Sequence, residues 1–227
     1  MPDFDDIPDL PPASNRARRV PDVGHWQRVH GSPLTRREVE QRKRLAVVVS
    51  VVWIAVQFFA FGVRGDLSRL PWSYLFALCI APMSAGILAV VLAVRGGSFG
   101  LGTRTALVSA LAVLGPLSFM VSGFLMPMPY ENGEIGDLSF GAYCLNCTVA
   151  WALLPIVSAG LVLRSAFAAS SVWRSALLGA GCGLIAAGLF TLHCPVVGKW
   201  HIALAHGSAV LISALIGGVC LAWATRS

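Results

Sequence analysis

Residues 175–218 read SALLGAGCGLIAAGLFTLHCPVVGKWHIALAHGSAVLISALIGG, which is two long apolar runs joined by a short polar turn. A helix needs about 20 consecutive, mostly apolar residues to cross a hydrocarbon core about 30 Å thick. Both runs are close to that length, and neither alternates apolar with polar residues as the strands of a membrane barrel do. The stretch therefore predicts two membrane-spanning helices that meet at one face of the membrane.

The same pattern recurs along the chain, which has six apolar stretches of spanning length. Three of them contain proline, which membrane helices tolerate when neighbouring helices satisfy the freed backbone groups. We therefore expect an all-α membrane protein. A six-helix transmembrane bundle over residues 45–225 follows a short, largely disordered cytoplasmic tail over residues 1–44. The predicted spans cover residues 45–63, 72–94, 105–125, 145–163, 175–192 and 202–223.

Charge is concentrated in the tail. Of the 227 residues, 56% are apolar and 12% are charged, and the first 44 hold nine of the 17 Lys and Arg and seven of the 11 Asp and Glu. The remaining eight basic and four acidic residues are too few to cover the surface of a soluble domain. The tail also lacks the apolar core of a cleavable signal peptide, so the first span itself is expected to target the chain to the membrane.

The distribution of Lys and Arg predicts the orientation of the spans, because cytoplasmic segments of membrane proteins carry an excess of basic residues. With the N-terminus in the cytoplasm, fourteen of the 17 fall on the cytoplasmic side, and only Arg64, Arg69 and Lys199 fall on the other. Both termini are therefore expected in the cytoplasm. The net charge of +6 follows from this orientation and does not require direct nucleic acid binding.

The tail begins with a candidate recognition segment. Phe4, Ile7 and Leu10 recur at every third position with aspartates between them, and Trp26 adds an aromatic side chain. Residues 1–33 have too little apolar surface to fold alone. They are either a solvated tail or a short acidic element that folds onto a basic partner. In the second case these four apolar and aromatic residues are the expected partner-binding contacts.

A helix is expected after the proline-rich part of the tail. In the segment SPLTRREVEQRKRL, Thr35 is a candidate N-cap, and Glu38 follows it at the spacing of a capping box. The two side chains would satisfy backbone amides that have no partner inside the first helical turn. This pattern predicts a juxtamembrane helix from about residue 36 that continues into the first span.

The predicted topology brings three cysteines and three histidines to the periplasmic ends of the last three spans. They are Cys144, Cys147, Cys194, His193, His201 and His206. The last of these lies about 7.5 Å deeper in its span than His201 if the helix is regular. A titratable group inside a span is costly and by default suggests a function. The other cysteines, Cys79, Cys182 and Cys220, are expected to be small packing residues.

Four interpretations of this group stay open. One is a disulfide between Cys194 and either Cys144 or Cys147, which the oxidising periplasm permits. Another is a zinc site made by these three cysteines and one histidine. A third is a membrane thiol/quinone oxidoreductase that uses the Cys144–Cys147 pair. In the fourth, the residues are purely structural and the histidines bind loop carbonyls.

The predicted spans lack the groups that most transport and catalytic functions need. They contain no Asp, Glu, Lys or Arg, and the chain has no Walker loop, nucleophile elbow or HExxH motif. Small residues are abundant instead, as in GAGCGLIAAG at 179–188 and LIGGV at 215–219, and they permit close helix packing. We therefore expect a tightly packed bundle that is not an enzyme and has no catalytic residues.

Several of these motifs resemble one known family. The segments LRSAF at 163–167, LHCP at 192–195 and HGSAVLISALIGG at 206–218, with the Gly/Ala-rich span between the first two, are similar to the NrsF-like family. Its members are six-span inner-membrane anti-sigma factors of Gram-negative bacteria, named for a negative regulator of sigma factor F. The resemblance covers about residues 45–225, is best from residue 143 onward and is sharpest at LHCP.

The resemblance implies a function, a partner and a site. A short N-terminal segment captures an extracytoplasmic-function sigma factor at the membrane, and the bundle releases it on an envelope or oxidative signal. Family members pair an outer cysteine at the start of the fourth span with the cysteine of LHCP. Cys194 fits the second role, and Cys144 is preferred to Cys147 for the first. Apart from the zinc considered above, no cofactor is expected.

Overall fold

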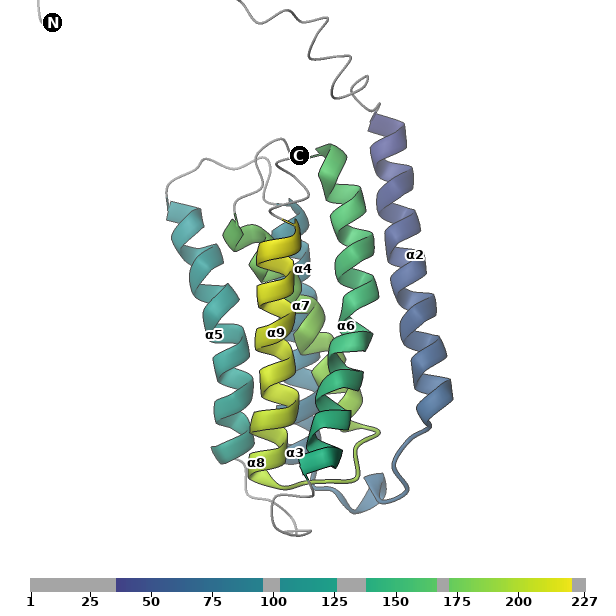
Figure 1. Ribbon diagram of the computed structural model, residues 1–227, viewed down its shortest axis with the longest axis vertical. Coiled ribbons are helices and arrows are strands. Elements are labelled where there is room, and N and C mark those ends of the chain that lie inside the picture. The colour runs from purple at the N-terminus through teal and green to yellow at the C-terminus, as the bar shows by residue number, and fades with distance from the viewer. Residues whose placement is uncertain (1–35, 96–102, 126–137, 167–171, 222–227) are drawn as a thin grey trace, which may run out of the picture. The chain divides into compact units, whose positions relative to one another are not determined.

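The computed structural model describes four stretches of the chain, and within them it contains helices and no strand. Six helical segments are long and apolar enough to cross a membrane, which confirms the all-α, six-helix fold expected from the sequence (Figure 1). The described stretches are residues 36–95, 103–125, 138–166 and 172–221. The spanning segments are Glu40–Phe61, Trp72–Val94, Leu107–Leu125, Gly141–Gly160, Val172–Thr191 and Lys199–Val219.

Four of the spans are single α-helices, and the other two contain π-helical turns, whose hydrogen bonds close over five residues rather than four. The single helices are α2 (Arg36–Phe61), α5 (Thr103–Leu125), α6 (Leu138–Ala166) and α7 (Val172–Thr191). The second span comprises α3 (Trp72–Leu75), η3 (Phe76–Ile80) and α4 (Ala81–Arg95), and the short η2 (Leu67–Arg69) precedes it. The last span comprises α8 (Lys199–His201), η5 (Ile202–Gly207), α9 (Ser208–Ile216) and η6 (Gly217–Leu221).

Helix α7 forms the centre of the bundle. It contacts α4, α5, α6 and α9 (Figure 1). In the most apolar 18-residue stretch of α7, 72% of the residues are buried inside the protein. The corresponding share is 28% or less for each of the first four spans. Lipid tails are as apolar as leucine, so membrane helices associate through close packing rather than through escape from water. The Gly- and Ala-rich composition of α7 suits this central position, because small residues let several neighbours approach at once.

Glycines on α7 allow the closest of these approaches. A Cβ atom added to Gly86 of α4 would lie 2.6 Å from the carbonyl oxygen of Gly181, and one added to Gly181 would lie 2.8 Å from that of Gly86. A Cβ atom on Gly179 would lie 2.1 Å from the carbonyl oxygen of Ser213 in α9. Side chains cannot occupy such positions, so the backbone of α7 is in direct contact with α4 and α9.

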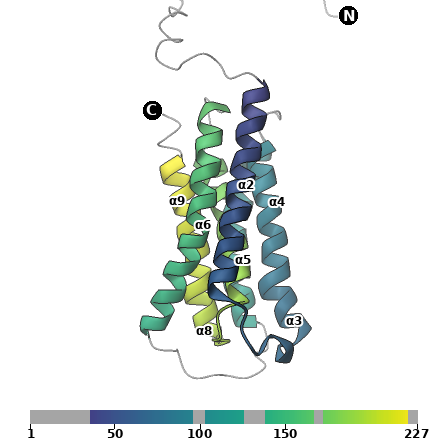
Figure 2. The same cartoon turned by 90° about the vertical axis from the view of Figure 1, so that its right-hand side faces the viewer.

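Helix α2 lies at the edge of the bundle, where it packs against α6 (Figures 1 and 2). In its most apolar 18-residue stretch, no residue is buried inside the protein. Large apolar side chains remain uncovered along it, and Leu45 and Phe59 are 64% and 83% exposed. The first span is therefore the least embedded of the six, and most of its surface is left for lipid.

Arg174 joins α7 to α4 at the end of the bundle where α2 begins, which we call the basic end. Its Nε and Nη2 donate to the carbonyl oxygens of Ala93 and Val94, at 2.5 Å and 3.3 Å. These carbonyls belong to the last turn of α4, where no helical amide remains to bind them and where a cation also interacts favourably with the helix dipole. The opposite end, where α6 begins and α7 ends, is called the cysteine end below.

Replacing Gly179 by alanine is expected to destabilise the bundle, because the added methyl group collides with the Ser213 carbonyl and forces α7 away from α9. Overpacking of this kind costs about 1–3 kcal/mol. Gly141→Ala is the matched control, since no atom lies within 4 Å of the added Cβ, and it should leave stability unchanged or slightly raised. Thermal unfolding in detergent compares the variants, and equal midpoints would contradict the close α7–α9 contact.

Candidate functional site

The turn after α7 carries Cys194 into the interior of the cysteine end. The backbone amides of His193 and Cys194 both donate to the carbonyl oxygen of Phe190 at 2.9 Å, which winds the chain tightly past the last helical turn. Pro195 follows, and proline cannot continue a helix because it lacks an amide hydrogen. The side chain of Cys194 is left pointing inward and is 3% exposed.

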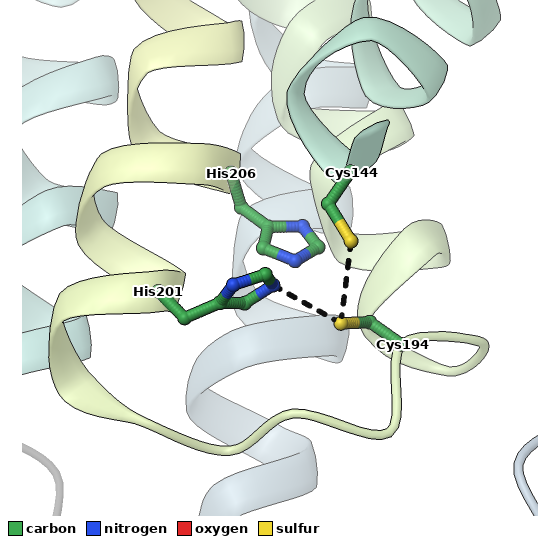
Figure 3. A group of neighbouring side chains, drawn as sticks. All are labelled: Cys144, Cys194, His201 and His206. Carbon is green, nitrogen blue, oxygen red and sulfur yellow. Dashed lines mark hydrogen bonds between the residues drawn. The ribbon is translucent and has the colours of Figure 1, made fainter. Parts of the chain in front are cut away.

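Helix α6 brings Cys144 to the same place. The helix begins at residue 138, ahead of the predicted fourth span, so Cys144 lies inside it and shares a buried face with Thr148 and Trp151 at helical spacing. The Sγ atoms of Cys144 and Cys194 are 3.7 Å apart, and both thiols are free (Figure 3). Of the two cysteines considered as partners of Cys194, Cys144 is the one whose thiol reaches it.

His201 and His206 approach the two thiols from the start of the last span. In a regular α-helix, residues five apart point about 140° away from each other, so these rings would not share a side. The π-helical segment η5 turns more slowly, and the two ring centroids lie 5.3 Å apart. The regular helix assumed from the sequence is therefore wrong at this point. Such π-helical turns are frequent at functional sites.

Cys144, Cys194, His201 and His206 form what we call the Cys/His cluster (Figure 3). Each offers one ligand atom within 4.8 Å of the other three, and all four residues are buried. The Nε2 atom of His201 is 3.2 Å from Cys194 Sγ, and Nδ1 of His206 has no hydrogen-bond partner among the described residues. Two thiols and two imidazoles are a common donor set for zinc, and thiolates also favour Cu(I).

The neighbours of Cys194 favour its thiolate form. Hydrogen bonding from the Cys144 thiol, helped by His201 and His206, holds the pKa of the Cys194 thiol well below its usual value, although burial acts in the opposite direction. The thiolate is the form of cysteine that binds metals and attacks disulfides. The surroundings of Cys194 thus favour the form of cysteine that a metal site needs.

His193 and Cys147 lie outside the Cys/His cluster. The Nδ1 atom of His193 bonds the carbonyl oxygen of Gly62, and burial lowers the pKa of its imidazole, which keeps it neutral. Its ring packs edge-on or tilted against four aromatic rings, those of Phe58, Phe61, Trp151 and Phe190. Cys147 is half-buried on the following turn of α6. The cluster thus has two cysteines and two histidines, unlike the zinc site considered from the sequence.

Arg64 is a buried residue of the cysteine end that the sequence did not single out. It is 6% exposed, and its Nε and Nη2 bind the two carboxylate oxygens of Asp66 at 2.6 Å and 2.7 Å. Its Nη1 donates to the carbonyl oxygen of Cys194 at 2.6 Å, and Nη2 donates to that of Pro195 at 3.1 Å. A bidentate carboxylate and two carbonyl acceptors satisfy the guanidinium, which would otherwise be too costly to bury.

These bonds fasten the end of α2 to the turn that carries Cys194. The backbone amide of Arg64 also donates to the carbonyl oxygen of Leu192 at 3.0 Å, and the contact between His193 and Gly62 lies beside it. Because α2 packs against α6 as well, the first span contacts both elements that supply the thiol pair. The signal that could have predicted this buried ion pair was an Arg and an Asp two residues apart in the apolar segment FGVRGDL.

The remaining residues singled out from the sequence divide into two groups. Cys79 and Cys182 are buried at 3% and 6% exposure inside their spans, in the positions expected of small packing residues. The side chain of Cys220 lies outside the described residues. The four residues expected to bind a partner also lie outside the described residues, in the tail, so the structure gives no position for Phe4, Ile7, Leu10 or Trp26.

Arg64→Leu is expected to lower the stability of the protein by about 2 kcal/mol, because it removes hydrogen bonds from a charged group to three buried or half-buried acceptors. Arg69→Leu removes the same charge from an exposed position of the same segment and should change the unfolding midpoint little. Thermal unfolding in detergent provides the comparison. Equal effects of the two substitutions would show that the Arg64 contacts do not hold the turn.

A family model described as NrsF, negative regulator of sigma F, matches residues 30–226 of the chain. The match includes all six spanning segments and the whole Cys/His cluster. Comparison with curated proteins and comparison with solved structures each found no match. Because the matched segment covers nearly the whole chain, the chain belongs to the NrsF family of negative regulators of sigma F.

Proposed function

We propose that the chain is a membrane-bound anti-sigma factor. Its tail holds an extracytoplasmic-function sigma factor on the cytoplasmic side of the inner membrane, and a change in the Cys/His cluster on the periplasmic side releases it. The family supports the regulatory role, and the excess of basic residues at the basic end supports this orientation. The observation that carries the switch is the 3.7 Å approach of two free thiols from different helical elements.

The spacing of the thiols is compatible with a metal ion in the resting state. Two thiolates bound at about 2.3 Å to a tetrahedral zinc ion lie about 3.8 Å from each other, close to the 3.7 Å between the sulfurs of Cys144 and Cys194. A disulfide would need about 2.05 Å. His201 and His206 supply the two further donors that complete four-fold coordination. We therefore propose that Zn²⁺, or another soft ion such as Cu(I), is held here while the thiols are reduced.

Oxidation then offers a release mechanism. A two-electron oxidant takes both electrons from the two deprotonated thiols, and a Cys144–Cys194 bond forms. A metal ion held by the cluster would then lose two of its four donors. The sulfurs must close from 3.7 Å to about 2.05 Å. Rotation of the two side chains and a shift of α6 relative to the turn together supply this change in the proposed mechanism. Shifts of about 1–2 Å between packed helices are a common form of switching movement.

Helix α2 is the element best placed to transmit this movement. It contacts α6, which carries Cys144, and through Arg64 it is bonded to the carbonyl oxygen of Cys194. The tail precedes α2 directly in the chain. A change in the position of α2 therefore moves the point at which the proposed sigma-binding segment is attached. Within that segment, Phe4, Ile7, Leu10 and Trp26 remain the proposed contacts, because the first three recur at every third position among aspartates and the fourth is aromatic.

The sigma-factor proposal predicts a redox-dependent complex. The full chain, purified from its own host under reducing conditions, should retain a sigma factor, and a variant that starts at Pro33 should retain none. Diamide should dissociate the complex of the full chain but not that of Cys194→Ser, which cannot form the bridge. Cys182→Ser, outside the cluster, should behave like the unchanged chain. If the full chain and the truncated variant bind equally little, the anti-sigma role is wrong.

The metal proposal predicts about one zinc ion per chain in protein purified under reducing conditions, measured by mass spectrometry of the metal content. His201→Ala and Cys144→Ser should each lose the ion, whereas Cys147→Ser should keep it, because Cys147 lies outside the cluster. The same comparison with Cu(I) tests the other soft ion. A chain that binds neither ion would contradict the metal-bound resting state and leave the oxidation of the thiols as a separate test.

A further inference from the structure

The first span leaves a groove on one side of the bundle. Helix α2 packs against α6, and a cavity of about 460 Å³ lies where α2 and α6 meet the facing sides of α4 and α7. The space is within the range of about 300–1,000 Å³ that is typical of small-molecule sites. Figure 2 shows α2 with α6 and α4 on its two sides. The groove therefore lies between spans, at the depth of the membrane interior.

The walls of the groove are mostly apolar and suit a hydrocarbon chain. They are formed by aliphatic side chains such as Val47, Ile87 and Ile185. Two hydroxyl groups also line it, but Ser50 already donates to the carbonyl oxygen of Ala46 at 2.7 Å, and Ser158 donates to the carbonyl oxygen of Pro155 at 3.0 Å. The two hydroxyls also lie 3.2 Å from each other, across α2 and α6. Both are therefore engaged within the protein, and the interior of the groove offers a ligand mainly apolar contact.

One end of the groove is charged. Lys43, on the second turn of α2, is the charged residue among those that line it, and its side chain is half-buried. Glu40, the nearest acid along the helix, is 4.0 Å from Arg44 instead. Basic residues crowd this part of α2, with Arg36, Arg37, Arg42, Lys43 and Arg44 in nine positions. Clusters of this kind beside a span attract anionic lipid headgroups.

We propose that the groove binds one acyl chain of an anionic glycerophospholipid, whose phosphate lies against Lys43. The hydrocarbon walls and the single cation at the mouth match the two parts of such a lipid. The bound chain fills the space between α2 and α4 and so holds the first span beside the bundle. This site is separate from the Cys/His cluster and does not depend on the identity of the sigma factor.

Native mass spectrometry of the delipidated full chain tests the proposal, with dioleoyl phosphatidylglycerol and dioleoyl phosphatidylcholine as probes. The chain should retain one phosphatidylglycerol in preference to phosphatidylcholine. Lys43→Gln should weaken that binding about fivefold, which corresponds to loss of one charge near the headgroup, and Lys43→Arg should preserve it. The unfolding midpoint of each variant in lipid-free detergent confirms that it is folded.

Two neighbouring valines provide the matched control for the groove itself. Val47 and Val48 are 62% and 56% exposed, but only the first of them lines the groove. Val47→Trp should fill the groove and abolish retention of the lipid, whereas Val48→Trp should not. Equal effects of the two substitutions, or equal retention of the two lipids, would overturn the proposal. It would also be overturned if Val47→Trp converted a dimer of the chain into monomers, because the groove would then be an interface.

Discussion

Direct backbone contact between α7 and its neighbours is the constraint on which the other features depend. Membrane helices gain nothing from hiding apolar surface in an apolar solvent, so they must fit closely to associate. Glycines at the α4–α7 and α7–α9 crossings bring main chains together at distances that no side chain permits. A helix held on several sides in this way has a fixed position along its axis. The turn that follows it, and with it Cys194, is therefore placed accurately.

The Cys/His cluster depends on that placement, because its four residues come from three separately positioned elements. Cys144 comes from α6, Cys194 from the turn after α7, and the two histidines from the start of the last span. The π-helical segment η5 is a local departure from ideal helix geometry, and it brings the second histidine to the side of the first. Irregular backbone of this kind is frequent where it brings side chains into a functional arrangement. The proposed metal-bound and oxidised forms would be two states of this one site.

Hydropathy was sufficient to predict the six spans, because length and apolarity alone decide whether a helix crosses a membrane. The meeting of Cys144 with Cys194 was open from the residues alone and was preferred only on the resemblance. Both His201 and His206 were candidates from the sequence, but the approach of their rings was not predictable, since a π-helical turn shifts side chains around the helix without a clear signal in composition. Arg64 was counted only as a loop charge, because burial of an arginine depends on carbonyl groups that come from residues about 130 positions away.

Because α2 is weakly embedded in the bundle, its sequence is less constrained by packing than that of α7. The crossing positions of α7, such as Gly179 and Gly181, are restricted to glycine by main-chain contact, whereas most positions on α2 need only remain aliphatic. Substitutions therefore accumulate in the first span at little cost to folding. Relatives should lose recognisable pairwise identity there first, while the spacing of small residues in α7 persists. The segment that joins the tail to the bundle is thus free to change in sequence without disturbing the core.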